Sequence, residues 1–194
     1  KDPVNKLKLR PLGIPSAIRR ITAICVLQMY KGRFAKYLLP FNYAFGVHGG
    51  VDFITNTLRL GVEKYISIPE SEGRLPSRSL ISLDIRNMFN AISRQKARQL
   101  ICREFPELEP FVDCLYEDYG QTIVRRSNGK WESISVQEGF SQGCPASPIL
   151  AALVLTAILS KINRHLVCRA QKRLTDGDAL DDGQGGIPIT LGYV

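Results

Sequence analysis

The sequence lacks the cysteine pattern and the signal segment that mark secreted proteins, and it lacks the cysteine pairs of a structural zinc site. Its five cysteines are odd in number, lie far apart and form no Cys-x-x-Cys pair. This pattern argues against a disulfide framework or a zinc site and indicates reduced thiols. No charged start followed by an apolar stretch and a small-residue cleavage site is present, so nothing predicts secretion. We therefore expect a protein of a reducing compartment.

Long hydrophobic runs are also missing. The longest apolar run covers residues 149–159 and is interrupted only by Thr156. Because a helix that spans a bilayer needs ~20 apolar residues, this run predicts a buried helix, and we expect no membrane partner. The sequence contains no internal repeat, which argues against a repeat architecture.

Acidic residues are scarce relative to basic ones. The 194 residues include 26 Lys and Arg against 18 Asp and Glu, for a formal charge of +8. Such an excess favours a polyanionic partner such as nucleic acid or an anionic membrane face, although basic residues also cover ordinary solvated helices. The share of apolar residues, 44%, and of charged residues, 23%, indicates a folded domain that could have two lobes.

Helical and strand-like apolar periods both occur, which predicts an α+β fold. The first expected helix begins at a Ser16 cap and ends at Pro40. The others cover 51–65, 94–105 after a Ser93 cap, 110–119 and about 147–167. The expected strands cover 6–10, 79–85, 121–126, 131–137 and 187–194. Asn128-Gly129 lies between the two central strands and is a strong hairpin signal. In the first helix, the apolar residues fall near one face: Ile18, Ile21, Cys25 and Met29.

One carboxylate is anomalous. The strand predicted over 79–85 places Asp84 beside Ile85, and an unpaired carboxylate near a core is costly. An exposed cap at a strand end is one explanation, and a role in chemistry is the other. Residues 82–90, Ser-Leu-Asp-Ile-Arg-Asn-Met-Phe-Asn, resemble motif A of reverse transcriptases. The resemblance implies that Asp84 and the Ile85 carbonyl hold magnesium, and that Phe89 excludes a 2′-hydroxyl; an ordinary core aromatic is the alternative for Phe89.

A second string is more specific. Residues 138–148 read Glu-Gly-Phe-Ser-Gln-Gly-Cys-Pro-Ala-Ser-Pro. This string resembles motif B, the Gln-Gly-Cys-Pro-x-Ser-Pro signature of retroelement and group II intron polymerases. Gly143 allows a close backbone approach to a ligand, Pro145 and Pro148 stiffen the start of a helix, and Ser147 can accept from orphan amides there.

The resemblance to motif B also implies roles for single residues. Gln142 and Gly143 are expected to contact the incoming deoxynucleotide. Gly143, Pro145 and Ser147 are expected to face the template or the primer. Ala146 stands where family members often carry leucine. A plain junction between a loop and a helix is the alternative.

The third string is basic. Residues 10–16, Arg-Pro-Leu-Gly-Ile-Pro-Ser, resemble the fingers motifs of the same polymerases, and Arg19 and Arg20 follow them. Guanidinium groups suit phosphate because they offer paired donors at fixed spacing. The resemblance implies that Arg10 and Arg20 bind the triphosphate and that Lys8 and Arg19 contact template or primer. Which of the four reaches phosphate is open, because each alone is an ordinary solvated charge.

A loop between the first two helices adds to the resemblance. Residues 43–50, Tyr-Ala-Phe-Gly-Val-His-Gly-Gly, stand where relatives carry an aromatic-glycine turn before a helix. His48 departs from their basic or proline-containing versions, and we expect it to be structural or to face the template.

The strings occur in the family's order, and the resemblance therefore implies a partial reverse transcriptase domain over 1–194. Its fingers would cover about 1–78 and its palm about 79–194, and fingers-like segments could be interleaved with the palm. The palm would be an antiparallel sheet backed by helices, with no thumb. Residues 191–194 match the start of the family's next strand, and the pair of aspartates of motif C would follow it, beyond the last residue of the sequence. We therefore expect a fragment that is inactive alone.

The implied function is RNA-directed DNA polymerisation for a mobile element of the non-LTR or group II intron type. An RNA template, a DNA primer and deoxynucleotides would be the partners. Two Mg²⁺ ions, with Mn²⁺ as a substitute, would assist nucleotidyl transfer to the primer 3′-hydroxyl. The chain would act inside the cell, and in the nucleus if the element is eukaryotic. The alternative is a degenerate relic that binds nucleic acid without catalysis.

Overall fold

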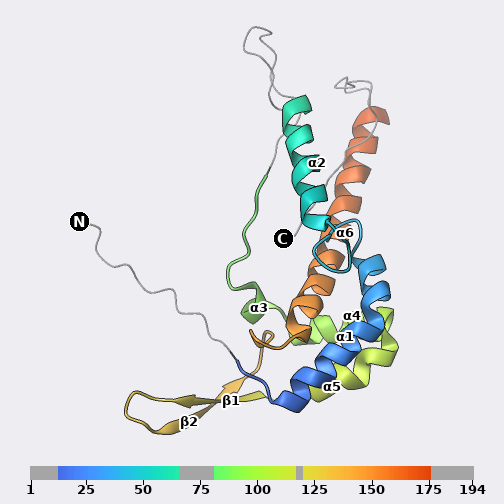
Figure 1. Ribbon diagram of the computed structural model, residues 1–194. Coiled ribbons are helices and arrows are strands. Elements are labelled where there is room, and N and C mark those ends of the chain that lie inside the picture. The colour runs from blue at the N-terminus through green and yellow to red at the C-terminus, as the bar shows by residue number, and fades with distance from the viewer. Residues whose placement is uncertain (1–12, 66–80, 117–119, 176–194) are drawn as a thin grey trace, which may run out of the picture. The chain divides into compact units, whose positions relative to one another are not determined.

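The computed structural model describes residues 13–65, 81–116 and 120–175 (Figure 1). Within these residues the chain combines α-helices with a two-stranded antiparallel sheet, which confirms the predicted α+β class. The strands predicted over 6–10 and 187–194 lie outside the described residues, and so do Lys8 and Arg10.

The described chain forms two compact units, each built from separated stretches of sequence. The first unit contains residues 13–29, 87–116 and 120–151, and the second contains residues 30–65, 81–86 and 152–175. Helices α1 (Ala17–Leu38) and α6 (Ala146–Thr175) each continue from one unit into the other. The predicted division between fingers and palm near residue 78 stays a prediction.

The bounds of α1 follow its local sequence. The Ser16 hydroxyl accepts from the backbone N–H of Arg19 at 3.4 Å, which satisfies one of the orphan donors at the helix start. The helix ends at Leu38, two residues before Pro40, as predicted.

The apolar face predicted on α1 is exposed. Ile18 and Met29 are 80% and 77% exposed, whereas the buried apolar positions of the helix are Ala23, Phe34 and Leu38. These buried residues recur at helical spacing on a different side of the helix. Tertiary contacts, rather than the strongest apolar period, determined which side is covered.

In the second unit, the predicted loop precedes α2 (Gly50–Tyr65). The Asn42 side chain is buried and accepts a backbone N–H two residues on at 2.9 Å, so the turn satisfies its own polar groups. The rings of Tyr43 and Phe53 lie 5.0 Å apart. A Cβ on Gly50 would lie 1.9 Å from the Tyr43 carbonyl oxygen, so the helix can begin here only at a glycine. His48 is exposed in this loop.

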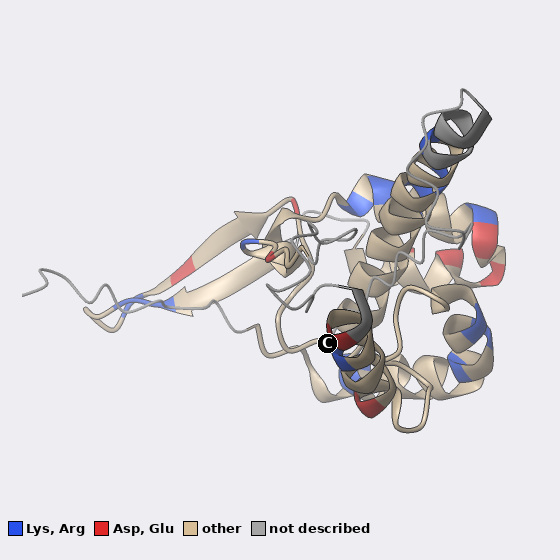
Figure 2. Cartoon of the chain, turned by 90° about the horizontal axis from the view of Figure 1, so that it is seen from above, with Lys and Arg blue, Asp and Glu red and all other residues tan. Residues whose placement is uncertain are grey.

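In the first unit, the predicted hairpin is confirmed. Strand β1 (Gly120–Arg125) pairs antiparallel with β2 (Trp131–Val136), and Arg125 lies opposite Trp131 at the turn end. Gly129 has a φ of 79°, which an Asn-Gly turn requires. Basic residues lie near the turn of this hairpin (Figure 2).

The strand predicted over 79–85 is wrong in its described part. Residues 81–85 form no regular structure, and Ile81 and Leu83 are exposed. A strand needs a neighbour that satisfies its backbone N–H and C=O groups. Among the described residues, β1 and β2 pair only with each other, so no palm sheet covers this segment.

The remaining helices of the first unit are short. They are α3 (Met88–Ala91), α4 (Arg94–Glu104), the 3₁₀ turn η2 (Pro106–Leu108) and α5 (Glu109–Tyr116). The predicted cap on α4 is confirmed, because the Ser93 hydroxyl accepts from the Lys96 N–H at 3.3 Å. The buried core residues of these elements are Ala97, Leu100, Ile101, Leu108, Val112, Leu115 and Tyr116.

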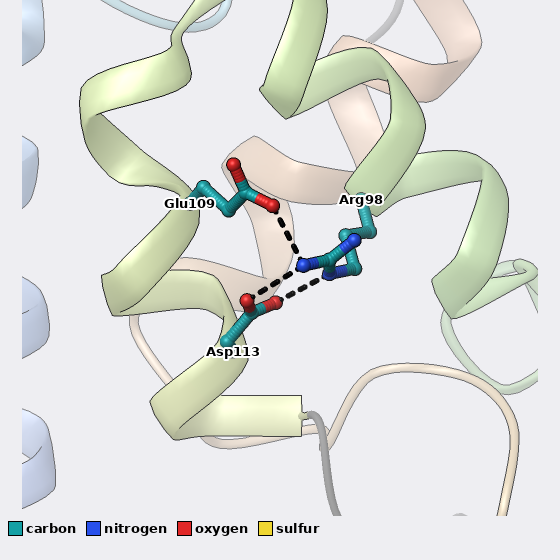
Figure 3. A network of polar contacts seen from close by, with 3 residues as sticks. All are labelled: Arg98, Glu109 and Asp113. Carbon is teal, nitrogen blue, oxygen red and sulfur yellow. Dashed lines mark hydrogen bonds and ion pairs between the residues drawn. The ribbon is translucent and has the colours of Figure 1, made fainter.

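A three-residue network joins α4 to α5 on the surface (Figure 3). Arg98 donates from Nε to Asp113 at 2.6 Å and from Nη2 to Asp113 at 2.9 Å, so the pair is bidentate. The same Nη2 donates to Glu109 at 2.6 Å. The hydrogen bond from Arg98 lowers the pKa of Asp113 and raises the pKa of Arg98.

This network predicts a specific pH dependence. Because the pKa of Asp113 is lowered in the folded state, its stabilising effect is present above the ordinary carboxyl pKa of about 3.9 and disappears as pH falls through the lower folded value. Asp113→Asn should therefore be less stable than the unchanged chain at neutral pH, and the gap should narrow at about pH 3. Urea unfolding at both pH values measures the gap.

Glu63→Gln is the matched control. Glu63 pairs with Arg59 at 3.9 Å, and both side chains are more than 60% exposed, so little stabilisation is expected. A gap for Asp113→Asn that does not change with pH would contradict the role given to the network.

The helix predicted from about 147 to 167 is confirmed, and α6 continues eight residues further, to Thr175. Among the described helices, α6 alone is long and apolar enough to cross a membrane, over Ala146–Arg169. The core helix of a soluble protein meets the same criterion, and the first turns of α6 bury Ile149, Leu150 and Leu153. This finding is weak support for a membrane span.

Candidate functional site

The loop between β2 and α6 carries the most specific of the sequence strings. Two of its glycines have positive φ, 73° at Gly139 and 122° at Gly143, which glycine adopts without steric cost. The side chains of Phe140 and Cys144 are each 2% exposed and anchor the loop in the first unit. The apolar contacts of these two buried side chains therefore hold the loop in a defined conformation.

The loop lies against the second half of the string that resembles motif A. The Phe140 N–H donates to the Phe89 carbonyl at 2.6 Å, and the Gly139 N–H donates to the Ile92 carbonyl at 3.1 Å. A Cβ on Gly139 would lie 2.5 Å from the Asn90 Cα, closer than real Cβ contacts allow. Only glycine at 139 lets the two backbones approach this closely.

The basic string reaches the same loop. The Gly13 N–H donates to the Gln142 carbonyl at 2.7 Å. A Cβ on Gly13 would lie 2.1 Å from the Ser141 hydroxyl oxygen, so these segments are also closely packed. Parts of all three strings, far apart in the chain, therefore meet at residues 139–143.

Tyr116, the last residue of α5, supports the loop from inside. Its ring meets the Phe140 ring edge-on, with centroids 5.0 Å apart and planes at 61°. The guanidinium carbons of Arg19 and Arg94 lie 5.2 and 5.3 Å from the ring centroid. Such cation–π contacts strengthen when they are removed from water, as they are here with Tyr116 8% exposed.

A short chain of hydroxyls links Tyr116 to the loop. The Ser147 hydroxyl donates to the Ser141 carbonyl at 2.7 Å, and the Tyr116 hydroxyl lies 3.0 Å from the Ser147 oxygen. Because serine has one hydroxyl proton, Tyr116 must be the donor to Ser147. Burial raises the pKa of Tyr116, which keeps its hydroxyl protonated for this donation.

The two arginines beside Tyr116 bind backbone carbonyls. Arg94 donates to the carbonyls of Gly139 at 2.7 Å and Val136 at 2.8 Å, so it holds both ends of the segment that leaves β2. Arg19 donates to the Leu115 carbonyl at 2.6 Å, and its buried Nε has no partner in the described structure. Burial lowers the pKa of Arg94, with Arg19 adding a smaller effect in the same direction.

The predicted site residues differ in where they lie. Phe89, Gln142 and Pro145 are half-buried, and Gly143 is exposed. Ser147 is 1% exposed and its hydroxyl is used within the protein, so it positions the loop. The predicted contact of Ser147 with template or primer stays a prediction, which this burial does not favour.

The predicted basic residues Arg19 and Arg20 also differ in exposure and in their contacts. The Arg20 side chain is exposed and makes no hydrogen bond or ion pair with other described residues, which leaves its guanidinium available for phosphate. Arg19 is instead largely committed to Leu115 and Tyr116. Sequence reasoning missed Arg94 and Tyr116, because no string marks them and only the folded chain brings them to the loop.

Asp84 and Ile85 belong to the second unit and are exposed. The Asp84 carboxylate and the Ile85 carbonyl are oxygen ligands of the kind that Mg²⁺ prefers, and an exposed aspartate leaves room for the waters that Mg²⁺ retains. Among the described residues, no group of three or more His, Cys, Asp or Glu side chains could hold a metal. The predicted binding of magnesium by Asp84 and the Ile85 carbonyl therefore stays a prediction.

No family model, curated protein or solved structure matches this chain. Any assignment of function consequently depends on the three strings and on the way their segments meet.

Proposed function

We propose that this chain is the fingers-and-palm part of an RNA-directed DNA polymerase of a retroelement. Its substrate would be a deoxynucleoside triphosphate, and its partners would be an RNA template and a DNA primer. The polymerase fold, with an antiparallel palm sheet, is part of the proposal and goes beyond the α+β class.

The observation that carries the proposal is the meeting of the three strings at residues 139–143. The strings were singled out by resemblance to separate polymerase motifs, and a chance set of matches gives no reason for their segments to be neighbours. Hydrogen bonds of 2.6 Å from Phe140 to Phe89 and 2.7 Å from Gly13 to Gln142 join them in the first unit. Backbone amides and glycines at such a loop suit a ligand that approaches closely.

The proposal assigns a task to each residue. Phe89 lies under the sugar and excludes a 2′-hydroxyl, and Gln142 with the Gly143 backbone contacts the nucleotide. Arg20 contacts phosphate. Asp84 with the Ile85 carbonyl would hold magnesium, which neutralises phosphate charge when bound. Arg94 and Tyr116 act as positioning residues because they fix the loop.

Sugar discrimination tests the proposal in the chain itself. In the presence of Mg²⁺, the chain should bind a deoxynucleotide more tightly than the matching ribonucleotide. Phe89→Ala should remove the steric block and reduce this preference about tenfold, or about 1.4 kcal/mol. Titration calorimetry of both nucleotides measures the ratio of affinities.

Phe53→Ala is the control, because Phe53 is a half-exposed phenylalanine of α2 in the second unit. It should leave the ratio unchanged. Equal affinity of the unchanged chain for both nucleotides would contradict the role of Phe89.

Primer extension by the natural protein, on an RNA template with Mg²⁺ and deoxynucleotides, tests the reaction. Asp84→Ala should abolish it, whereas Asp52→Ala, which changes an exposed aspartate of α2, should not. Extension that survives Asp84→Ala would overturn the assignment of that residue. Binding of nucleic acid without any extension would instead favour the relic.

A further inference from the structure

The β1–β2 hairpin has two unlike faces. Paired residues of an antiparallel sheet point to the same side, and the register places Gln121, Ile123, Arg125, Trp131, Ser133 and Ser135 on one face. We call these six residues the indole face. The opposite face carries Thr122, Val124, Glu132, Ile134 and Val136.

The indole face presents a large aromatic surface to solvent. Trp131 and Ile123 are each 67% exposed, although burial of such large apolar side chains stabilises a folded protein. The Arg125 guanidinium carbon lies over the Trp131 ring, 5.8 Å from its centroid. An exposed indole next to a guanidinium offers both a stacking surface and a donor for phosphate.

The charge of the hairpin is mostly positive. Arg125, Arg126 and Lys130 lie at its turn, and Glu132 is the acidic residue of the two strands and their turn (Figure 2). Arg126 forms an ion pair with Glu132 at 2.5 Å on the opposite face. Arg125 and Lys130 have no such partner among the described residues, so the free charge near the indole is positive.

The β1–β2 hairpin is fixed to the first unit at its base, and its strand edges are not covered by another described strand. Arg94 donates to the Val136 carbonyl at 2.8 Å, which fixes the end of β2 to the first unit. Within the described structure, β1 and β2 have no further strand beside them. The indole face is therefore presented on an anchored two-stranded ribbon.

We infer that this hairpin binds single-stranded nucleic acid through its indole face. A base stacks on Trp131, and Arg125 and Lys130 contact the neighbouring phosphates. Complementary charge distinguishes this occupant from an apolar peptide, which would gain nothing from Arg125 and Lys130. The inference goes beyond the proposed function, because stacking here needs neither Asp84 nor the 139–143 loop.

Trp131 is the single tryptophan of the chain, so its fluorescence reports on this face alone. The full chain is titrated with an oligouridine of about 12 nucleotides, within the usual site sizes for single strands. Emission should be quenched in a saturable way as a base stacks on the indole. Heparin, a polyanion without bases, should bind through charge with much less quenching. Binding of oligouridine without a change in emission would overturn the inference.

Substitutions separate stacking from charge. Trp131→Ala should weaken oligouridine binding about fivefold or more, whereas Trp131→Phe should retain part of the affinity. Arg125→Ala should weaken binding more than Arg126→Ala, because Arg126 lies on the opposite face and is paired with Glu132. Equal effects of the two arginine changes would show binding by net charge alone and would overturn the proposed face.

Asp84→Ala and Phe89→Ala should leave the quenching unchanged. If oligouridine quenches the emission of the unchanged chain, but that chain binds the deoxynucleotide and the ribonucleotide equally, the polymerase proposal fails while the hairpin proposal holds. The reverse pattern would mean that the hairpin proposal fails alone.

Discussion

Gly139→Ala is expected to lower the free energy of unfolding by about 3 kcal/mol or more. The left-handed φ of 73° at this position costs alanine conformational free energy. The alanine Cβ would also lie 2.5 Å from the Asn90 Cα and 2.6 Å from the Asn90 carbonyl oxygen. These are backbone atoms, so no side-chain rotation relieves the clash. Urea unfolding measures the loss as a lower midpoint.

Gly129→Ala isolates the backbone cost. Gly129 has a similar φ of 79°, but an added Cβ would meet nothing within 4 Å. Its expected loss is about 1 kcal/mol, the cost of the left-handed conformation alone. The difference between the two variants therefore measures the close approach between residues 87–92 and the loop. Equal losses would contradict the role given to Gly139.

Tyr116→Ala is expected to cost about 3–5 kcal/mol of stability, in the range of large aromatic truncations in a core. The change removes the edge contact with Phe140 and the surface against which Arg19 and Arg94 pack. Both arginines are partly removed from water, so their charges would lose a favourable partner. Thermal unfolding provides the measurement.

Tyr116→Phe is the matched variant. It keeps the ring and removes only the hydroxyl that donates to Ser147, so the expected cost is about 0.5–1.5 kcal/mol. A loss for Tyr116→Ala no larger than that for Tyr116→Phe would show that the ring contributes little. In that case the loop would be held mainly by its hydrogen bonds to Phe89 and Ile92.

The substitutions at Gly139 and Tyr116 also bear on the proposed function. Gly139 and Tyr116 touch no ligand in the proposal, yet both determine where Gln142 and Gly143 lie. If the proposal is correct, Tyr116→Phe should weaken nucleotide binding without changing the preference for deoxynucleotides. The preference should depend on Phe89 alone.

Local sequence rules predicted much of the described secondary structure. The Ser16 and Ser93 hydroxyls cap helices as expected, and Asn128-Gly129 forms the hairpin turn. These signals work because each depends on hydrogen bonds or φ angles within a few residues. The strand expected over 79–85 failed for the opposite reason, since its apolar residues needed a neighbouring strand that the described chain does not provide.

The candidate site was predicted only in part. The sequence singled out Phe89, Gln142 and Gly143 by resemblance, and the described structure places their segments side by side. It did not indicate Arg94 or Tyr116, which come from α4 and α5 and reach the loop only in the folded unit.

By itself, the sequence determined the caps, the hairpin, the long α6 and the positions of the three strings, because each is encoded within a short window. Only the tertiary structure decided that Gly13, Phe89 and Gln142 meet at one loop, and that the apolar face of α1 with Ile18 and Met29 is exposed. Contacts between distant residues depend on how whole elements pack, and no local period specifies that packing.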